Sequence, residues 1–269
     1  MLNKRKRGQT TVFIIIGVVI VVGIVLFFIL KGDASEHDEG YSQSSKINPN
    51  SYLKTCLNDK IRGDIRELRL KGGYFSSPLS VNFKFEGEEP NNIAYLCYTN
   101  EYIKKCTNQE PLLISHLEEE IKDKIDEGSL VEKCWDSLIL DYKAKNYKVN
   151  GSYDNWTTYL KRNKFGVKLR GVDLTIKKEN ETNKIDKIEA IEIPTKIYNL
   201  AEVAQEIINK EAEYCDFEYS GYMLRNPEYE ISTEKAPDES LIYTVTEMET
   251  NKKFRFAIRN CVTPSSKKE

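Results

Sequence analysis

One uninterrupted apolar block stands near the start of the chain. Positions 10–30 read TTVFIIIGVVIVVGIVLFFIL and hold no charged side chain. As an α-helix rising about 1.5 Å per residue, the block would span about 31 Å, which matches the hydrocarbon core of a bilayer. The pattern predicts one transmembrane helix at 10–30.

The charges on either side of this block predict its orientation. Lys4–Arg7 precede it, and acidic residues from Asp33 onward follow it. Because Lys and Arg stay on the cytoplasmic side of membrane helices, we expect a basic cytoplasmic leader at 1–9 and an extracellular C-terminal part. A cleaved secretory signal is the rival interpretation, but such a signal ends in small residues and this block does not. The predicted localisation is the cell membrane, as a single-pass protein.

The chain after the block divides into a tether and a domain. Residues 31–49 are polar, rich in serine and without periodicity, which predicts a flexible linker. Residues 50–269 carry apolar positions at helical and strand spacing. They predict one extracellular domain that is long enough to bury a core.

Three amphipathic helices are predicted from apolar stripes. Gly72-Gly73 would end the first helix, and Gly128 would end the second. The stripes are Leu53, Cys56, Leu57, Ile61, Ile65 and Leu68; then Leu113, Leu117, Ile121 and Ile125; then Leu200, Val203, Ala204, Ile207 and Ile208.

Polar residues at the helix starts predict N-caps. Asn50 or Ser51 would cap the first helix, and Asn199 would cap the last. Ser129 and Glu132 have the spacing of a capping box, which predicts a further short helix. We therefore expect three to four helices in the domain.

Alternation of apolar and polar positions predicts the strands. Helices and strands are segregated along the chain, which favours an α+β fold with a mostly antiparallel sheet. The complete predicted fold class is an N-terminal transmembrane helix followed by a disulfide-stapled α+β ectodomain. The expected strands lie at 79–85, 93–98, 144–149, 165–178, 184–193, 228–233, 240–247 and 253–260.

All six cysteines lie after the apolar block, which suits disulfides formed outside the cytoplasm. No CxxC spacing occurs, so a zinc site has little support. Cys97–Cys106 is the pair with a physical argument, because short loops close most readily. Cys56–Cys134 and Cys215–Cys261 complete the expected pairing without such an argument.

Three Asn-X-Ser/Thr triplets also lie in the predicted extracellular part. They begin at Asn150, Asn155 and Asn180, and the first two fall in a region that looks like a loop. Because a glycan on a loop projects into solvent, these are candidate glycosylation sites.

The sequence contains no recognised catalytic motif. GxSxG, HExxH, the P-loop and GxGxxG are all absent, and we predict no catalytic, cofactor-binding or metal-binding residue. His37 lies in the linker and is interpreted as solvated, and His116, near the start of the second helix, is interpreted as a surface or boundary histidine; neither is predicted to bind a metal. Glu118–Glu120 is interpreted as the wet face of that helix. Because carboxylates are abundant, a two-carboxylate hydrolase stays open as an alternative.

The start of the apolar block resembles the leader of archaeal type IV pilin-like proteins. Lys6-Arg7-Gly8-Gln9-Thr10-Thr11-Val12-Phe13 matches a basic segment that ends in Gly before Gln. The resemblance implies processing between Gly8 and Gln9, with the hydrophobic helix kept on the mature protein. Pilin subunits commonly carry Glu where this chain has Phe13, which weakens the filament interpretation.

A broader resemblance covers most of the chain. After the leader come Tyr-Leu-Lys-Thr-Cys-Leu at 52–57, Lys-Gly-Gly-Tyr at 71–74, Lys-Ile-Tyr-Asn-Leu-Ala-Glu-Val-Ala at 196–204 and Phe-Arg-Phe-Ala-Ile at 254–258. This order resembles uncharacterised single-pass surface proteins of small-genome archaea. The resemblance implies a cell-surface location and a shared fold, and it implies no activity.

The sequence therefore favours a membrane-anchored extracellular protein without catalytic activity, with a binding, adhesion or cell-envelope role. Its expected partners are the lipid bilayer and a cell-surface protein or glycan. The net charge is −2 and the leader holds four of the positive charges, so the remainder is acidic and a poor binder of nucleic acid. A pilin-like filament subunit is the alternative, and an extracellular hydrolase is the second.

Overall fold

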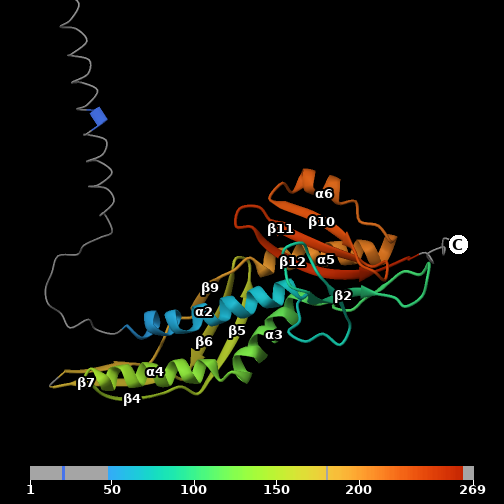
Figure 1. Cartoon of the computed structure of the whole chain (residues 1–269). Coiled ribbons are helices and arrows are strands. Elements are labelled where there is room, and N and C mark those ends of the chain that lie inside the picture. The colour runs from blue at the N-terminus through green and yellow to red at the C-terminus, as the bar shows by residue number, and fades with distance from the viewer. Residues whose placement is uncertain (1–19, 22–47, 180, 263–269) are drawn as a thin grey trace, which may run out of the picture. The chain divides into compact units, whose positions relative to one another are not determined.

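The computed structural model describes residues 20–21, 48–179 and 181–262. The chain divides into two compact units, Met1–Lys46 and Ile47–Glu269. The second unit holds the folded domain, and Figure 1 shows its elements in chain order.

The predicted fold class needs a correction. Within the described ranges, no helix is both long enough and apolar enough to cross a bilayer. The longest of these helices is α2 (Pro49–Leu70), which carries charged residues along its whole length. The span expected at 10–30 lies outside the described residues, apart from Ile20 and Val21, as do the leader and nearly all of the linker. The fold that the structure supports is an α+β domain with disulfides and a mostly antiparallel sheet.

Between residues 48 and 262 the structure describes five helices, where we expected three to four. The additional helix is α6, whose seven residues include one buried side chain, Tyr222, and are too few to show a period. The helices are α2, α3 (Leu113–Glu127), α4 (Leu130–Ala144), α5 (Ile197–Tyr214) and α6 (Tyr219–Arg225).

The main sheet is mostly antiparallel and has the strand order β1-β2-β12-β11-β10, with the short β3 beside β2. Its one parallel pairing joins β12 to β2, which brings Ala257 opposite Tyr95. The three strands expected near the C-terminus are confirmed as β10, β11 and β12, and they form a meander. The strands are β1 (Ser80–Phe83), β2 (Asn91–Tyr98), β3 (Thr107–Asn108), β10 (Tyr229–Lys235), β11 (Leu241–Glu247) and β12 (Lys252–Arg259).

Two further antiparallel sheets have three strands each, in the orders β4-β7-β8 and β5-β6-β9. The single strand expected at 165–178 is in fact β6 and β7, because Gly171 turns the chain with φ +62°. A Cβ at Gly171 would collide with the Asp154 carboxylate, so glycine is required there. The strands are β4 (Lys148–Ser152), β5 (Asn155–Lys161), β6 (Lys164–Arg170), β7 (Asp173–Lys178), β8 (Glu181–Ile185) and β9 (Ile191–Pro194).

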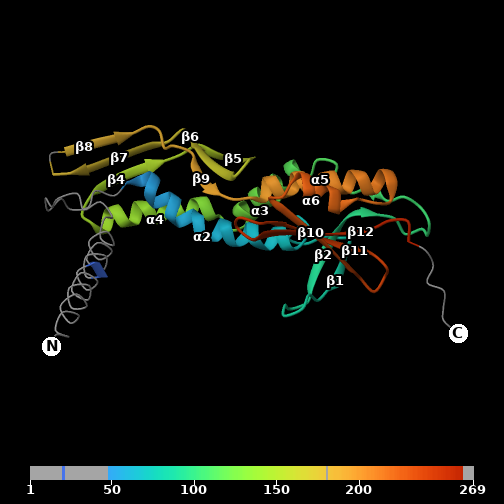
Figure 2. The same ribbon diagram turned by 90° about the horizontal axis from the view of Figure 1, so that it is seen from above.

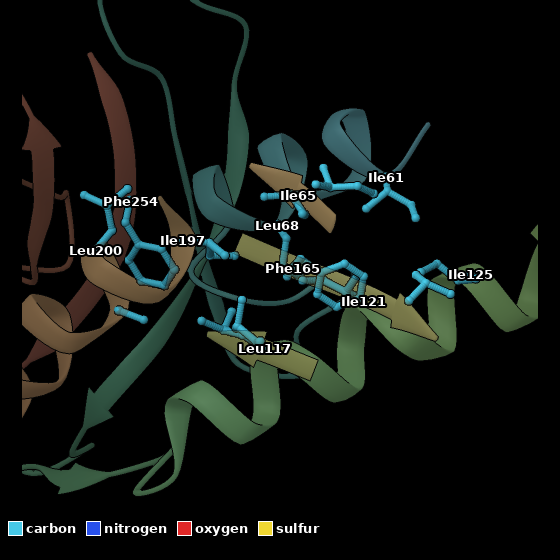
Figure 3. Packing of buried hydrophobic residues seen from close by; sticks show 14 of the residues in the cluster. Ile61, Ile65, Leu68, Leu117, Ile121, Ile125, Phe165, Ile197, Leu200 and Phe254 are labelled. Carbon is cyan, nitrogen blue, oxygen red and sulfur yellow. The ribbon is translucent and has the colours of Figure 1, made fainter. Parts of the chain in front are cut away.

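Helix α2 joins these parts, because it packs against α3, α4, β9 and β12. Figure 2 shows α2 running from the side of α4 to the strands of the main sheet. Its apolar stripe is buried as predicted, and Figure 3 shows Phe165 of β6 between Ile65 of α2 and Ile121 of α3. Helix α5 extends the same core, because its residues Ile197 and Leu200 lie beside Phe254 of β12 (Figure 3). One continuous hydrophobic cluster therefore connects all three sheets.

The structure contains three disulfides, with the expected pairing. Cys56–Cys134 joins α2 to α4 with Cα atoms 5.8 Å apart, and Cys97–Cys106 closes a local loop. Cys215–Cys261 joins the end of α5 to the residues that follow β12. No described cysteine is free. The first of these disulfides therefore links two helices, and the third links the end of α5 to the residues that follow the main-sheet strand β12.

The predicted N-caps are wrong. The N-cap of helix α2 is Asn48, two residues before Asn50, and its side chain accepts hydrogen bonds from the backbone N–H groups of Asn50 and Ser51. Ser129 takes a left-handed conformation and makes no cap hydrogen bond, so the capping box does not form. Asn199 lies inside α5 and accepts a hydrogen bond from the backbone of Asn163 instead. In these cases a tertiary partner or the local turn outweighs the cap preference.

The acidic run on α3 is only partly solvated. Glu118 accepts hydrogen bonds from the Thr158 hydroxyl at 3.0 Å and from the backbone N–H of Leu160 at 3.0 Å, which ties α3 to β5. Glu120 accepts one from the backbone N–H of Phe75. Glu119, between them, is exposed. The interpretation of this run as a wet face therefore holds for Glu119 alone.

This difference gives a stability prediction. Replacing Glu118 with Ala leaves two donors without their acceptor, and we expect it to lower the free energy of unfolding by about 1–3 kcal/mol. Glu119→Ala is the matched control, and it should change that free energy by less than about 0.5 kcal/mol. Urea unfolding of both variants measures the difference, and equal midpoints would contradict the proposed link between α3 and β5.

Candidate functional site

Of the residues singled out from the sequence, Asn150 and Asn155 are exposed. They lie on β4 and β5 rather than in the expected loop. Asn180 falls outside the described residues, as do Gly8 and Gln9. Nothing in the structure brings Asn150 and Asn155 into a shared site, and their glycosylation stays a prediction.

The histidine that the structure describes has a structural role. His116 is partly buried, and its Nε2 lies 2.9 Å from the carbonyl oxygen of Gly73. Its ring packs on Tyr74 with centroids 4.3 Å apart, and its Nδ1 is 3.9 Å from Glu110. Tyr74 in turn donates a hydrogen bond to Glu110. His37 lies outside the described residues. Within those residues, no group of three or more His, Cys, Asp or Glu side chains is arranged to hold a metal.

A cavity that sequence reasoning did not anticipate lies where α2, the β5–β6 turn, the β9–α5 corner and the β11–β12 turn meet. Its volume is about 520 Å³. Five of the residues that line the cavity are basic, and no lining residue is acidic. The lining is Arg62, Gly63, Ile65, Arg66, Arg69, Asn163, Pro194, Thr195, Lys196, Thr250 and Lys252.

Helix α2 supplies three arginines to one wall. Arg62, Arg66 and Arg69 stand four and three residues apart, so they share one face of the helix. Arg62 and Arg66 are exposed, and neither makes an ion pair or hydrogen bond with any side chain that the structure describes. Three arginines without a described ion pair make this wall positive, and like charges at this spacing also repel one another.

Arg69 lies deepest and is 6% exposed. Its Nη1 donates a hydrogen bond to the carbonyl oxygen of Lys253 at 2.6 Å, and no described carboxylate pairs with it. Burial and the neighbouring charge of Arg66 lower the pKa of Arg69 to about 10. The guanidinium stays protonated at neutral pH, so the cavity holds a buried positive charge without a counter-ion.

The opposite wall is polar and fixed by the backbone. The N–H of Thr195 bonds the carbonyl of Asn163 at 3.0 Å, which fastens the β5–β6 turn to the β9–α5 corner. Asn163 takes a left-handed conformation with φ 63°, which asparagine tolerates well. Its side-chain amide makes no hydrogen bond to another described residue. The wall therefore presents a free amide beside the Thr195 hydroxyl.

One of the five cations is already compensated. Lys196 Nζ lies 3.1 Å from Glu247 and 3.7 Å from Glu249, and the hydrogen bond to Glu247 raises the pKa of Lys196. Burial opposes ionisation of Glu247, but hydrogen bonds from Thr250 and the charge of Lys196 outweigh it and lower its pKa. Lys252 on the same turn has no partner among the residues described. Arg62, Arg66, Arg69 and Lys252 therefore remain available to an anion.

Gly63 keeps the cavity open. It lies in the interior of α2, where glycine is unfavourable relative to alanine. A Cβ at Gly63 would meet no atom within 4 Å, so packing does not require the glycine. A larger side chain there would enter the space beside Arg62 and Arg66.

The arginine spacing was a signal that the sequence already carried. Positions 62, 66 and 69 repeat at helical intervals on a helix whose apolar stripe was recognised. Lys252, Asn163 and Thr195 gave no such signal, because three separate turns bring them to the cavity. Comparisons with protein-family models, with curated proteins and with solved structures find no match.

The open space at Gly63 gives a second stability prediction. Gly63→Ala should raise the free energy of unfolding by about 1 kcal/mol, because it removes the cost of glycine in a helix without creating a clash. Gly221→Ala is the control, since its Cβ would collide with Glu218, whose side chain caps α6. Urea unfolding should show a gain for the first variant and none for the second. A loss with Gly63→Ala would mean that the cavity is more tightly closed than described.

Proposed function

We propose that the folded domain is a non-catalytic binding module that acts outside the cytoplasm and holds an anionic group in the basic cavity. The observation that carries the proposal is Arg69. A buried charge without a counter-ion costs free energy, and a protein keeps one where a ligand supplies the opposite charge. An anion beside Arg69 would remove that cost.

The exposed arginines support the same conclusion. Arg62 and Arg66 repel one another across one helical turn, and neither forms an ion pair with a described carboxylate. The planar guanidinium group binds carboxylate or phosphate through two parallel hydrogen bonds. Two such groups on one wall, with Lys252 on the β11–β12 turn, form a receptor for an anion rather than for a cation.

The lining of the cavity gives no support to the alternative of a hydrolase. A two-carboxylate hydrolase needs a pair of acidic side chains in its cleft. Among the residues that line this cavity there is no Asp or Glu. We therefore keep binding, with no catalytic step, as the proposed activity.

The disulfides support the proposed location. Three disulfides join all six cysteines, and such bonds persist in oxidising surroundings. The cell-membrane localisation and the pilin-like alternative concern residues outside the described ranges and stay predictions. The proposed partner is accordingly a cell-surface molecule that carries negative charge.

The first prediction of this proposal concerns anion binding. Sulfate added to the purified protein should shift the NMR signals of Gly63 and of the arginine side chains of α2, and chloride at equal ionic strength should not. Arg66→Gln should weaken sulfate binding about tenfold, as expected for the loss of a charge-assisted hydrogen bond. Gly63→Glu should weaken it more than Gly63→Gln, because the two side chains match in size and differ in charge.

The control for this experiment is Arg170→Gln. Arg170 is exposed at the far end of β6, away from the cavity, so its loss should leave sulfate binding unchanged. The pH dependence is a further check, because binding favours protonated Arg69. Affinity should be constant from about pH 6 to 9, because Arg69, with a pKa lowered to about 10, stays protonated over that range. Equal weakening by Arg170→Gln and Arg66→Gln would reduce the effect to general screening and overturn the proposal.

The second prediction concerns location. Protein extracted from its source cells in the presence of iodoacetamide, without reductant, should carry no alkylated cysteine, because all six are oxidised outside the cytoplasm. The same sample after reduction should take up six labels, which controls for access. Labelled cysteines in the unreduced sample would place the domain in a reducing compartment.

A further inference from the structure

The size of the basic cavity limits what the anion can be. About 520 Å³ lies within the range of sites for small organic molecules. An inorganic phosphate or sulfate fills only a small part of that space. The cavity therefore has room for a larger ligand, which would also contact the wall formed by Asn163 and Thr195.

That wall offers hydrogen-bonding groups suited to hydroxyls. The Asn163 amide is free to donate and to accept. Thr195 Oγ1 accepts a hydrogen bond from the backbone of Ile197 at 3.3 Å, which leaves its hydroxyl proton for a ligand. A sugar hydroxyl both donates and accepts, and therefore complements both groups.

The set of apolar residues in the lining contains no aromatic ring among the residues described. It consists of Ile65, Pro194 and Gly63. A nucleobase is normally held by stacking on an aromatic side chain, and an alkyl chain needs a continuous apolar surface. No aromatic ring is available here for stacking, so the lining does not favour a nucleobase.

From these three observations we infer that the cavity binds a hydroxylated anion, namely a sugar that carries a phosphate or a carboxylate group. The inference rests on the anion binding proposed above. The arginines of α2 hold the anionic group, and Asn163 and Thr195 hold the hydroxyls. A phosphorylated monosaccharide and a uronic acid residue of an envelope polysaccharide share this chemistry.

Calorimetric titration of the full-length protein tests the inference with a matched set of ligands. Glucose 6-phosphate and hexyl phosphate carry the same charged group, but only the first has hydroxyls. Glucose 6-phosphate should bind about tenfold tighter than hexyl phosphate and than adenosine monophosphate. Uncharged glucose should not bind measurably, and glucuronate distinguishes the carboxylate source from the phosphate source.

A variant separates the hydroxyl contacts from the fold. Asn163→Gly deletes the free amide and keeps both backbone hydrogen bonds, and glycine accepts the positive φ at this position. The variant should lower the affinity for glucose 6-phosphate about fivefold and leave the affinity for hexyl phosphate unchanged. An unfolded variant would lose both ligands, so the ratio of the two affinities reports on the contact itself.

The titration results separate the inferred sugar recognition from the proposed anion binding. Equal affinity for glucose 6-phosphate and hexyl phosphate, unaffected by Asn163→Gly, would overturn the sugar inference and leave anion binding intact. Tighter binding of adenosine monophosphate would likewise replace the sugar by a nucleotide. Failure of sulfate and every phosphate to bind would overturn the proposed function as well.

Discussion

The domain depends on one requirement, which is that helix α2 must bury its apolar face. A single stripe on that helix packs against α3, α4, β9 and β12, so one hydrophobic surface contacts two of the three sheets and reaches the third through α4. Ile65 and Leu68 share the core with Phe165 from one sheet, and Phe254 from another belongs to the same cluster. The burial of these side chains sets the position of the helix, and with it the position of every residue on the opposite face. The arginines that line the cavity are therefore placed by the packing behind them.

The periodicity of the sequence predicts those parts of the fold in which neighbours along the chain decide the structure. The amphipathic helices and the meander of β10, β11 and β12 were found because their apolar residues repeat within one element. Asn199 was wrongly assigned as a cap, because its side chain accepts a hydrogen bond from the backbone N–H of the distant residue Asn163 instead. The predicted number of helices was too low, and the predicted fold class included a membrane helix that the described residues do not contain. The cavity could be recognised only in the structure, because no local sequence pattern brings Asn163 and Lys252 to the same place as Arg66.

The distribution of charge sets the cavity apart from the rest of the domain. Most described cations on this acidic chain have a carboxylate partner or lie in open solvent, as the pair of Lys60 and Asp64 illustrates. Arg255 is as deeply buried as Arg69, but Glu88 neutralises it through two hydrogen bonds of 2.6 and 2.8 Å. The same chain thus provides an internal comparison, in which one buried guanidinium has its counter-ion and the other does not. A buried arginine is a structural cross-link in the first case, and in the second it is the group to which we assign anion binding.

The parallel pairing of β12 with β2 also determines when the chain can fold. β12 lies at the centre of the main sheet, so β2 lacks its inner neighbour until β12 has been synthesised. Contacts between residues as distant as 95 and 257 are slow to form, because a long loop must close first. A nascent chain that ends before β12 has its helices and its outer hairpins but no central strand to join them. Synthesis of β12 is thus the step that commits this domain to its native state, and a truncation before β12 removes the middle of the sheet rather than its edge.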